Sequence, residues 1–462
     1  MRRTAVLVVV LAFALLGVAA TANAQGYGVW EQSACVMGRG GATVASPCPD
    51  ASSIYFNPAG IVLIPGQIAS AGASVIAPRG HFTNSASGQV SDLLVKYYPV
   101  PNIYYKRNFA ADRAAAGIGV FAPYGLATDW PVTSEGRFLG YKSLVHSIYV
   151  QPTVAFKLND KVAIGGGIDI TRTSLELRQR LDLSTVAITG TPYTFGTLPV
   201  GPVPRGTDFA DVDIKGDAWH VGFQVGAIVK PHQRVSLGGR YMKGQTVDVT
   251  NGTVTYTQIM TGITTSPFLG PVLGGKNVDT LVSPNFQSGG KLSNQSGSAS
   301  LPLPDQFVVG VAVQATPKLM ALVDYQFIRW SMFQSLVIAQ TIAPTSAIIE
   351  NYQNTSGVRM GIDYAVNPDT SIRAGADFHG AAAPPETVTP NLPEGSRAEF
   401  SVGVGRKFGS ARIDAYYMYL HQGDRAGRTV GPASGVAPTT ALNNGTYTFM
   451  SNLFGVTFAV GF

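Results

Sequence analysis

Segments of strictly alternating residues recur along this chain, and they constrain its fold more than any other feature. The clearest segment closes the sequence. One of its faces carries bulky apolar residues and the other carries small or polar ones: Phe454, Val456, Phe458, Val460 and Phe462 alternate with Gly455, Thr457, Ala459 and Gly461. A period of two indicates a β-strand whose two faces meet different surroundings.

Several other alternating segments place charged residues on the less apolar face. These residues are Asp324, Arg359, Asp363, Arg373, Asp377 and Asp414. In a membrane barrel the apolar face meets lipid, and a charge facing lipid at mid-membrane costs about 2–4 kcal/mol. We therefore expect these side chains to point into the lumen of a transmembrane barrel.

The composition excludes the main alternatives. Only 13% of the residues are charged, against about 25% in soluble domains, which argues against an ordinary soluble enzyme. A helical membrane protein needs repeated apolar runs of about 20 residues, and none follows the N-terminal region. With 22 Phe and 19 Tyr the chain is too apolar for disorder. A net charge of +6 is too small to indicate a nucleic-acid partner.

The N-terminus predicts export. Arg2 and Arg3 precede an apolar stretch over residues 5–20, and Ala22-Asn23-Ala24 forms a small-x-small cleavage site. This pattern is typical of a secretory signal peptide over residues 1–24. A single membrane anchor is the alternative, but no stop-transfer charge cluster follows the apolar stretch.

Two cysteines, Cys35 and Cys48, remain after removal of the signal peptide. Exported proteins meet an oxidising environment, so we expect these two to form a disulfide. Closing a loop of this size stabilises a fold by about 3 kcal/mol in the chain-entropy model. Two buried free thiols are the alternative.

Connections between the alternating segments are short and long in turn. Six short ones have turn chemistry: residues 111–113, 159–161, 231–233, 316–318, 367–369 and 409–410. Seven long ones are rich in Gly, Ser, Thr and Pro: residues 83–98, 124–140, 181–215, 250–297, 333–355, 381–395 and 423–446. This asymmetry predicts an all-β fold, a 14-stranded antiparallel transmembrane β-barrel over residues 66–462 with its long loops outside.

A barrel of this width cannot fill its lumen with its own side chains. Residues 25–65 precede the first strand, lack strand periodicity, and hold both cysteines and several turn formers. We expect this segment to form an N-terminal hatch, or plug, inside the lumen.

Several motifs support a resemblance to a known family. They are Glu31-Gln32-Ser33-Ala34, Met37-Gly38-Arg39-Gly40, Ser53-Ile54-Tyr55-Phe56-Asn57-Pro58-Ala59-Gly60, Tyr124-Gly125-Leu126-Ala127-Thr128, Leu301-Pro302-Leu303-Pro304-Asp305 and Trp330-Ser331-Met332-Phe333-Gln334. Together they resemble the FadL-type long-chain fatty acid transporters, which include toluene-uptake relatives. The resemblance implies a monomer among the lipids of a Gram-negative outer membrane. It also implies energy-independent diffusion of a hydrophobic small molecule, released by hatch movement, with no cofactor.

The resemblance implies two moving parts. One is a lateral opening at a kink in the third strand, here about residues 114–124, where Gly117, Gly119 and Pro123 weaken strand pairing. The alternative is that the glycines only fit the curvature of the barrel. The other is Asn57-Pro58-Ala59, in which Asn side-chain bonds and a fixed Pro backbone would latch the hatch. Alternatively, this motif is only a turn between hatch and barrel.

Ligand contacts are less clear. Arg172, with Glu176, Arg178 and Arg180, falls on the inner face if alternation holds, and Arg suits a fatty acid carboxylate. A structural Arg/Glu network is the alternative role. No second basic position follows the ninth strand, so an uncharged aromatic hydrocarbon is the alternative ligand. We expect further apolar contacts, or a cover over the barrel top, from Tyr27, Phe195, Ile259, Met260 and Phe268.

Nothing in the sequence indicates an enzyme. Gly270–Lys276 resembles a phosphate-binding loop, but Asn277 replaces the Ser or Thr that would meet magnesium. No Gly-x-Ser-x-Gly element occurs, and the six histidines lack metal-ligand spacing. We therefore expect no catalytic residue, metal or cofactor. A general porin and an outer-membrane lipase remain as less favoured alternatives.

Overall fold

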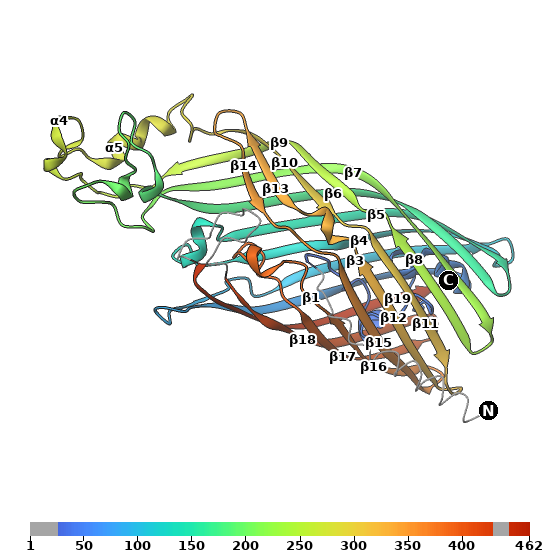
Figure 1. Ribbon diagram of the computed structural model, residues 1–462. Coiled ribbons are helices and arrows are strands. Elements are labelled where there is room, and N and C mark those ends of the chain that lie inside the picture. Colours follow the sequence, from blue (N-terminus) through green and yellow to red (C-terminus); the bar gives the residue numbers. More distant parts are fainter. Residues whose placement is uncertain (1–25, 428–442) are drawn as a thin grey trace.

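The computed structural model describes residues 26–427 and 443–462, so the predicted signal peptide lies outside the described residues. Within the described ranges, nineteen strand segments form one sheet. The sheet closes on itself because β1 pairs antiparallel with both β3 and the last strand, β19. Figure 1 shows the result as a tilted barrel. No helix in the described part of the chain is long and apolar enough to cross a membrane.

The strand segments follow one another around the wall. They are β1 (Gln67–Asn84), β2 (Val90–Asp92), β3 (Tyr98–Phe109), β4 (Ala114–Asp129), β5 (Lys142–Asn159), β6 (Val162–Asp182), β7 (Asp208–His232), β8 (Val235–Met242), β9 (Gln245–Gln258), β10 (Gln295–Leu303), β11 (Gln306–Gln314), β12 (Leu319–Ile328), β13 (Ser335–Gln340), β14 (Ser346–Ile349), β15 (Thr355–Asn367), β16 (Thr370–His379), β17 (Arg397–Phe408), β18 (Ala411–Ala426) and β19 (Gly445–Gly461).

These segments make fourteen crossings of the barrel wall, as predicted. Strand β2 pairs only with the outer end of β1. Four crossings are each split into two segments: β8/β9, β10/β11, β12/β13 and β14/β15. Asp305 lies at the breaks and accepts a hydrogen bond from the Gly244 N–H (2.7 Å), while its other carboxylate oxygen pairs with Arg329 (3.2 Å). The breaks in neighbouring crossings are thus held together by one carboxylate.

The six short turns lie where they were predicted, between β3 and β4, β5 and β6, β7 and β8, β11 and β12, β15 and β16, and β17 and β18. The long connections were predicted too wide. Strand β4 continues to Asp129, and the stretch 333–355 contains β13 and β14. Strands β13 and β14 are short runs of consecutive apolar residues, and the end of β4 is equally irregular, so period two did not mark these segments as strands. Part of the last predicted connection, 428–442, lies outside the described residues.

Residues 26–66 form a plug inside the barrel. Short helices account for much of it: α2 (Ala34–Met37), α3 (Ser53–Phe56) and the 3-10 helix η1 (Pro58–Leu63). Ser33 caps α2 by accepting a hydrogen bond from the Val36 N–H. All the residues of α2 and α3 are buried. Elements this short have no core of their own, so the wall must supply it.

The remaining helices lie in the connections between strands. They are η2 (Glu135–Phe138), η3 (Leu183–Thr185), η4 (Phe195–Thr197), η5 (Pro267–Leu269), α4 (Gly270–Leu273), α5 (Val278–Val282), η6 (Ser283–Phe286), η7 (Trp330–Met332) and η8 (Pro385–Thr387). Residues 183–207 and 259–293 pack together around a separate apolar core, which we call the outer lobe. In Figure 1 the outer lobe, marked by α4 and α5, projects beyond the far ends of the long strands.

The fit between wall and plug generates the first prediction. A Cβ atom at Gly238 would collide with the backbone of Val44 in the plug, whereas at Gly239 it would find its nearest neighbour 3.9 Å away, on the Val309 side chain. We expect Gly238→Ala to destabilise the folded barrel by about 1–3 kcal/mol, the usual range for overpacking. Gly239→Ala, the matched control, should leave it unchanged. Urea unfolding of both variants in detergent tests this, and equal midpoints would contradict it.

Candidate functional site

The wall holds the plug through hydrogen bonds from many directions. Asp324 of β12 accepts from the backbone N–H groups of Thr43 (2.7 Å) and Val44 (2.9 Å). On other strands, Ser401 accepts from the Gly40 N–H (3.0 Å) and Thr457 from the Ala34 N–H (2.9 Å). Because contacts reach the plug from well-separated strands, residues 26–66 lie within the lumen.

Inward-facing charges form a network beside the plug, as predicted from alternation. Arg373 pairs with Asp363 (2.9 Å) and Asp414 (2.7 Å), and Arg359 pairs with Asp377 (3.0 Å). Arg39 of the plug lies 3.9 Å from Asp363. Of the six charged residues that the alternating segments placed toward the lumen, Asp324, Arg359, Arg373, Asp377 and Asp414 are buried and Asp363 is partly buried. Pairing compensates the cost of removing these charges from water.

Asn57-Pro58-Ala59 lies where the plug meets β6 and β7. The Asn57 amide donates to the backbone carbonyls of Val44 in the plug (2.7 Å) and Ala227 in the wall (3.1 Å), and its oxygen accepts from the Ala59 N–H (3.2 Å). Pro58 opens η1. A side chain at Gly165 or Gly226 would collide with this motif. The motif is thus bonded to both plug and wall, and its part in gating remains a proposal.

Cys35 and Cys48 are joined by a disulfide within the plug. Both are buried. Arg39 donates hydrogen bonds to the Thr43 hydroxyl (3.0 Å) and to the Ser46 carbonyl (3.2 Å). The middle of the plug is therefore cross-linked both covalently and by hydrogen bonds.

An interior pocket of about 160 Å³ lies between the start of the plug and the outer part of the wall. Its lining is mainly apolar and includes Tyr27, Val29, Ile76, Leu93, Tyr98, Leu126, Leu392, Leu420, Phe449 and Leu453. Its charged members are Glu31, Glu394 and Arg397. A mostly apolar pocket with a few polar groups is the usual form of a small-molecule site.

Arg397 is the cation of this pocket and was missed in the sequence. Its Nε donates to Gln422 (3.3 Å), and it forms no ion pair with any carboxylate that the structure describes. Glu394, by contrast, accepts from the N–H groups of Gly26, Ala382 and Ala383. Burial raises the pKa of Glu394, although these N–H groups and Arg397 oppose the shift. The guanidinium thus makes no direct ion pair, although Glu31, Glu394 and Glu399 all lie close enough to interact with its charge.

The wall has a gap between β3 and β4. Pairing between these strands ends at Ile103 and Val120, although both strands continue outward. The pairing of β4 with β5 shifts register between Phe121 and Tyr124, so Pro123 lies in a bulge. A cavity of about 350 Å³ opens at this gap and is lined by Tyr98, Pro99, Val100, Phe121 and Tyr124, among others. We call it the wall cavity.

The start of the plug separates the two cavities. Val29 donates its N–H to the Pro123 carbonyl (2.8 Å), and Gly125 donates to the Tyr27 carbonyl (3.0 Å). Gly28 thus pairs with Tyr124 like a short added strand. Val29, Tyr98 and Gly125 line both the interior pocket and the wall cavity. Residues 27–29, which we call the N-terminal door, therefore form a partition between the two cavities.

The two predicted kink glycines have another role. Gly117 pairs with Lys106 and Thr153, and Gly119 pairs with Tyr104 and Gln151, so both lie in regular sheet. A Cβ at either position would crowd Ile54 of the plug. Of the three predicted residues, only Pro123 lies in the irregular part of the strand.

The prediction that Arg172 points inward is wrong. Arg172 pairs in register with Ile148 and Trp219, which are 54% and 65% exposed, and neighbours in register share a face. Arg172 also forms an ion pair with Asp217 (3.1 Å) on the outer surface. Glu176, Arg178 and Arg180 have the same parity along β6 and share this outer face. The alternative reading, a structural charge network, fits these contacts.

The remaining predicted contacts divide between the pocket and the outer lobe. Tyr27 lines the interior pocket, and its hydroxyl donates to the Pro302 carbonyl. Phe195 is buried in the core of the outer lobe and is not a surface contact. Ile259 is partly buried, whereas Met260 and Phe268 are 70% and 85% exposed.

Comparison with known proteins identifies relatives over nearly the whole chain. A family model described as "Outer membrane protein transport protein (OMPP1/FadL/TodX)" matches residues 15–462. A long-chain fatty acid transport protein of Salmonella typhi is 22% identical, covering 98% of both chains. The crystal structure of a Pseudomonas aeruginosa FadL homologue has a TM-score of 0.78 and 22% identity, covering 95% of this chain and 100% of that one. The Pseudomonas putida toluene transporter TodX has a TM-score of 0.66 at 16% identity, with the same coverage.

The contacts of Asp324 generate the second prediction. We expect Asp324→Leu to leave the N–H groups of Thr43 and Val44 buried without an acceptor, at about 1–3 kcal/mol each. Asp324→Asn, the matched control, keeps an acceptor oxygen and should lose much less. Hydrogen exchange at these two amides should be faster in the Leu variant than in the Asn variant. Equal exchange in both variants and the wild type would show that Asp324 does not hold the plug.

Proposed function

The chain belongs to the OMPP1/FadL/TodX family of outer membrane transport proteins, and from this premise we propose that it takes up long-chain fatty acids by passive diffusion. The members of this family carry hydrophobic compounds across the Gram-negative outer membrane as single-chain barrels, and they are not enzymes. The proposal concerns the ligand and the route. Because one chain closes the barrel, we expect a monomer to be sufficient.

Arg397 is the observation that supports a carboxylate ligand. It lies in the lining of an otherwise largely apolar pocket and forms no ion pair with the described residues. A guanidinium can bind a carboxylate through two parallel hydrogen bonds. The apolar lining would receive part of the acyl chain. The fatty acid transporters among the relatives agree with this ligand class.

A specific observation also favours a second candidate, an uncharged hydrocarbon. Glu31 and Glu394 line the same pocket as Arg397. An ionised carboxylate in the pocket would be attracted by one side chain and repelled by two, whereas a hydrocarbon would meet no charge penalty. A toluene transporter among the structural relatives agrees with this ligand class.

The N-terminal door suggests the route. It is held to β4 by two backbone hydrogen bonds, each contributing about 0.5–1.5 kcal/mol. Its displacement would join the interior pocket to the wall cavity, and from there the gap between β3 and β4 leads toward the lipid. A hydrophobic ligand gains by leaving into lipid and has no favourable path through water.

Capture from outside is the remaining step, and we assign it to the outer lobe. Met260, Phe268 and Val272 expose 70%, 85% and 73% of their surface there. Clustered exposed apolar residues commonly mark interaction sites. The lobe has its own buried core, which includes Phe195.

The third prediction concerns ligand class. We expect Arg397→Ala to weaken oleate binding to the purified barrel at least tenfold and to leave toluene binding unchanged. Arg172→Ala, the matched control, removes an arginine from the outer face and should affect neither. Binding is measured with radiolabelled ligand in detergent. Toluene binding without oleate binding would support the hydrocarbon candidate. Equal oleate affinity in the Arg397→Ala variant and the wild type would contradict the proposed contact with Arg397.

The fourth prediction concerns the route. Gly28 and Tyr124 form a non-hydrogen-bonded antiparallel pair, and the Cα spacing of about 4.5 Å in such pairs permits a disulfide. We expect Gly28→Cys/Tyr124→Cys to block oleate uptake into proteoliposomes when oxidised and to recover it when reduced. The wild type, treated in the same way, controls for reduction of Cys35–Cys48. Full uptake by the oxidised, disulfide-linked variant would exclude movement of the N-terminal door as a step in transport.

A further inference from the structure

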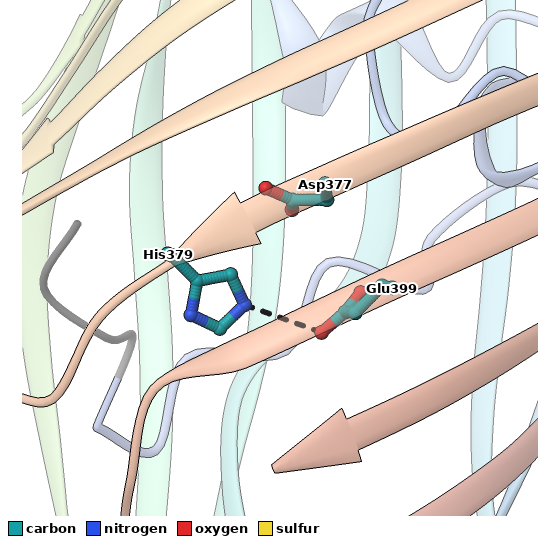
Figure 2. Close-up of side chains that lie close together, drawn as sticks. All are labelled: Asp377, His379 and Glu399. Atoms are coloured by element: carbon teal, nitrogen blue, oxygen red, sulfur yellow. Dashed lines mark hydrogen bonds and ion pairs between the residues drawn. The ribbon is translucent and has the colours of Figure 1, made fainter. Parts of the chain in front are cut away.

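Three buried side chains outside the ligand pocket form an unusual cluster. Asp377 and His379 of β16 and Glu399 of β17 all face the lumen and are 4%, 1% and 5% exposed. Asp377 lies directly opposite Glu399 in the register. Two carboxylates in this arrangement destabilise a sheet unless a positive charge compensates them. Figure 2 shows the three side chains, with His379 pointing toward Glu399.

The cluster has unused binding capacity. His379 Nε2 lies 3.2 Å from Glu399 Oε1. One oxygen of Asp377, Oδ1, and one ring nitrogen of His379, Nδ1, are buried without any hydrogen-bond partner. One candidate ligand atom from each of the three residues lies within 4.8 Å of the others. Buried polar atoms without partners are uncommon in folded proteins and call for an explanation, such as an ion.

The surrounding charges leave an excess of negative charge. Arg359 binds only Oδ2 of Asp377 (3.0 Å), which leaves Oδ1 free. Arg397 donates to Gln422. Glu31 of the plug is close enough to Glu399 for the two charges to interact, and one of its oxygens is also buried without a partner. Three carboxylates thus face two guanidinium groups.

We propose that Asp377, His379 and Glu399 bind a divalent transition metal of the Zn²⁺ class. One imidazole and two carboxylates suit zinc and its neighbours, whereas Mg²⁺ and Ca²⁺ prefer oxygen ligands alone. Tetrahedral coordination at about 2.1 Å places ligand atoms about 3.4 Å apart. The His379–Glu399 pair already has this spacing. The imidazole binds through Nε2, which already faces Glu399, and Asp377 contributes its free oxygen Oδ1. The ion would leave Nδ1 of the ring without a partner, so the free oxygen of Asp377 is the orphan atom that carries the proposal.

This site is separate from the proposed fatty acid contact, and its test does not depend on transport. Full-length barrel without a polyhistidine tag is folded in detergent, treated with chelator and titrated with Zn²⁺ by calorimetry. We expect one ion per chain. His379→Asn and Glu399→Gln should each weaken binding at least tenfold. The matched control is His220→Asn on β7, a histidine with no hydrogen bond at either ring nitrogen, which should bind like the wild type.

A second measurement uses the wild type alone, so that misfolding of a variant does not confuse the result. Co²⁺ in a tetrahedral nitrogen and oxygen site absorbs visible light far more strongly than hydrated Co²⁺. We expect this band to appear at one equivalent and to disappear when Zn²⁺ is added. A spectrum identical to that of Co²⁺ in buffer would overturn the proposal. Equal Zn²⁺ affinity in the His379 and His220 variants would also overturn it.

Discussion

Many polar side chains that the wall turns toward the lumen find their partners in the plug, and the rest of the structure depends on these contacts. The strands satisfy one another's backbone, but their inward side chains do not have this option. Gln224 and Gln151 both donate to the Ile54 carbonyl of the plug (2.8 and 2.9 Å), and Arg240 lies 4.6 Å from the centre of the Tyr55 ring. The plug in turn has helices too short to fold alone. Wall and plug therefore complete each other, and a gate made by expelling the whole plug would break all of these contacts at once.

The N-terminal door is hydrogen-bonded to the wall at β4 and β10, whereas the middle of the plug is bonded to strands on several sides. The middle of the plug carries the disulfide and is bonded to strands around the circumference. Residues 27–29 pair with β4 where β4 has lost its pairing with β3, and Tyr27 is also held by its hydroxyl bond to the Pro302 carbonyl and by packing against Trp330. The loss of pairing with β3 beyond Val120 frees the backbone groups of β4 that the door uses. The same irregularity therefore creates the gap in the wall and supplies the partner that covers it. Local opening of this short segment would break fewer contacts than expulsion of the whole plug.

The fourteen crossings could be predicted because lipid imposes one apolar face on every strand, and the turns carry their own residue chemistry. The side of the wall on which Arg172 lies was predicted wrongly, although the alternation along its strand indicates it. Arg172 falls on the same face as Ile168 and Ile170, which are exposed to the outside. A charged side chain on the outer face costs no free energy where that face lies beyond the lipid. Arg172 can therefore point outward, whereas the lipid forces Arg359 to point into the lumen. Arg397 does obey that rule, since it alternates with Ala398, and was overlooked. The cluster of Asp377, His379 and Glu399 was not predictable in the same way, because it depends on the register between two strands.

That register also links the two sites electrostatically. His379, Arg397 and Gln422 are direct neighbours across β16, β17 and β18, and Asp377 and Glu399 form the adjacent row. With the cluster empty, Glu399 and Glu31 partly offset the positive charge of Arg397. A divalent cation among Asp377, His379 and Glu399 would neutralise these carboxylates and leave the guanidinium to bind an anion. In the low dielectric of a plugged barrel, such a change acts strongly over one strand spacing. Recognition of a fatty acid or of a hydrocarbon would then depend on the charge state of a single buried cluster, in addition to the shape of the pocket.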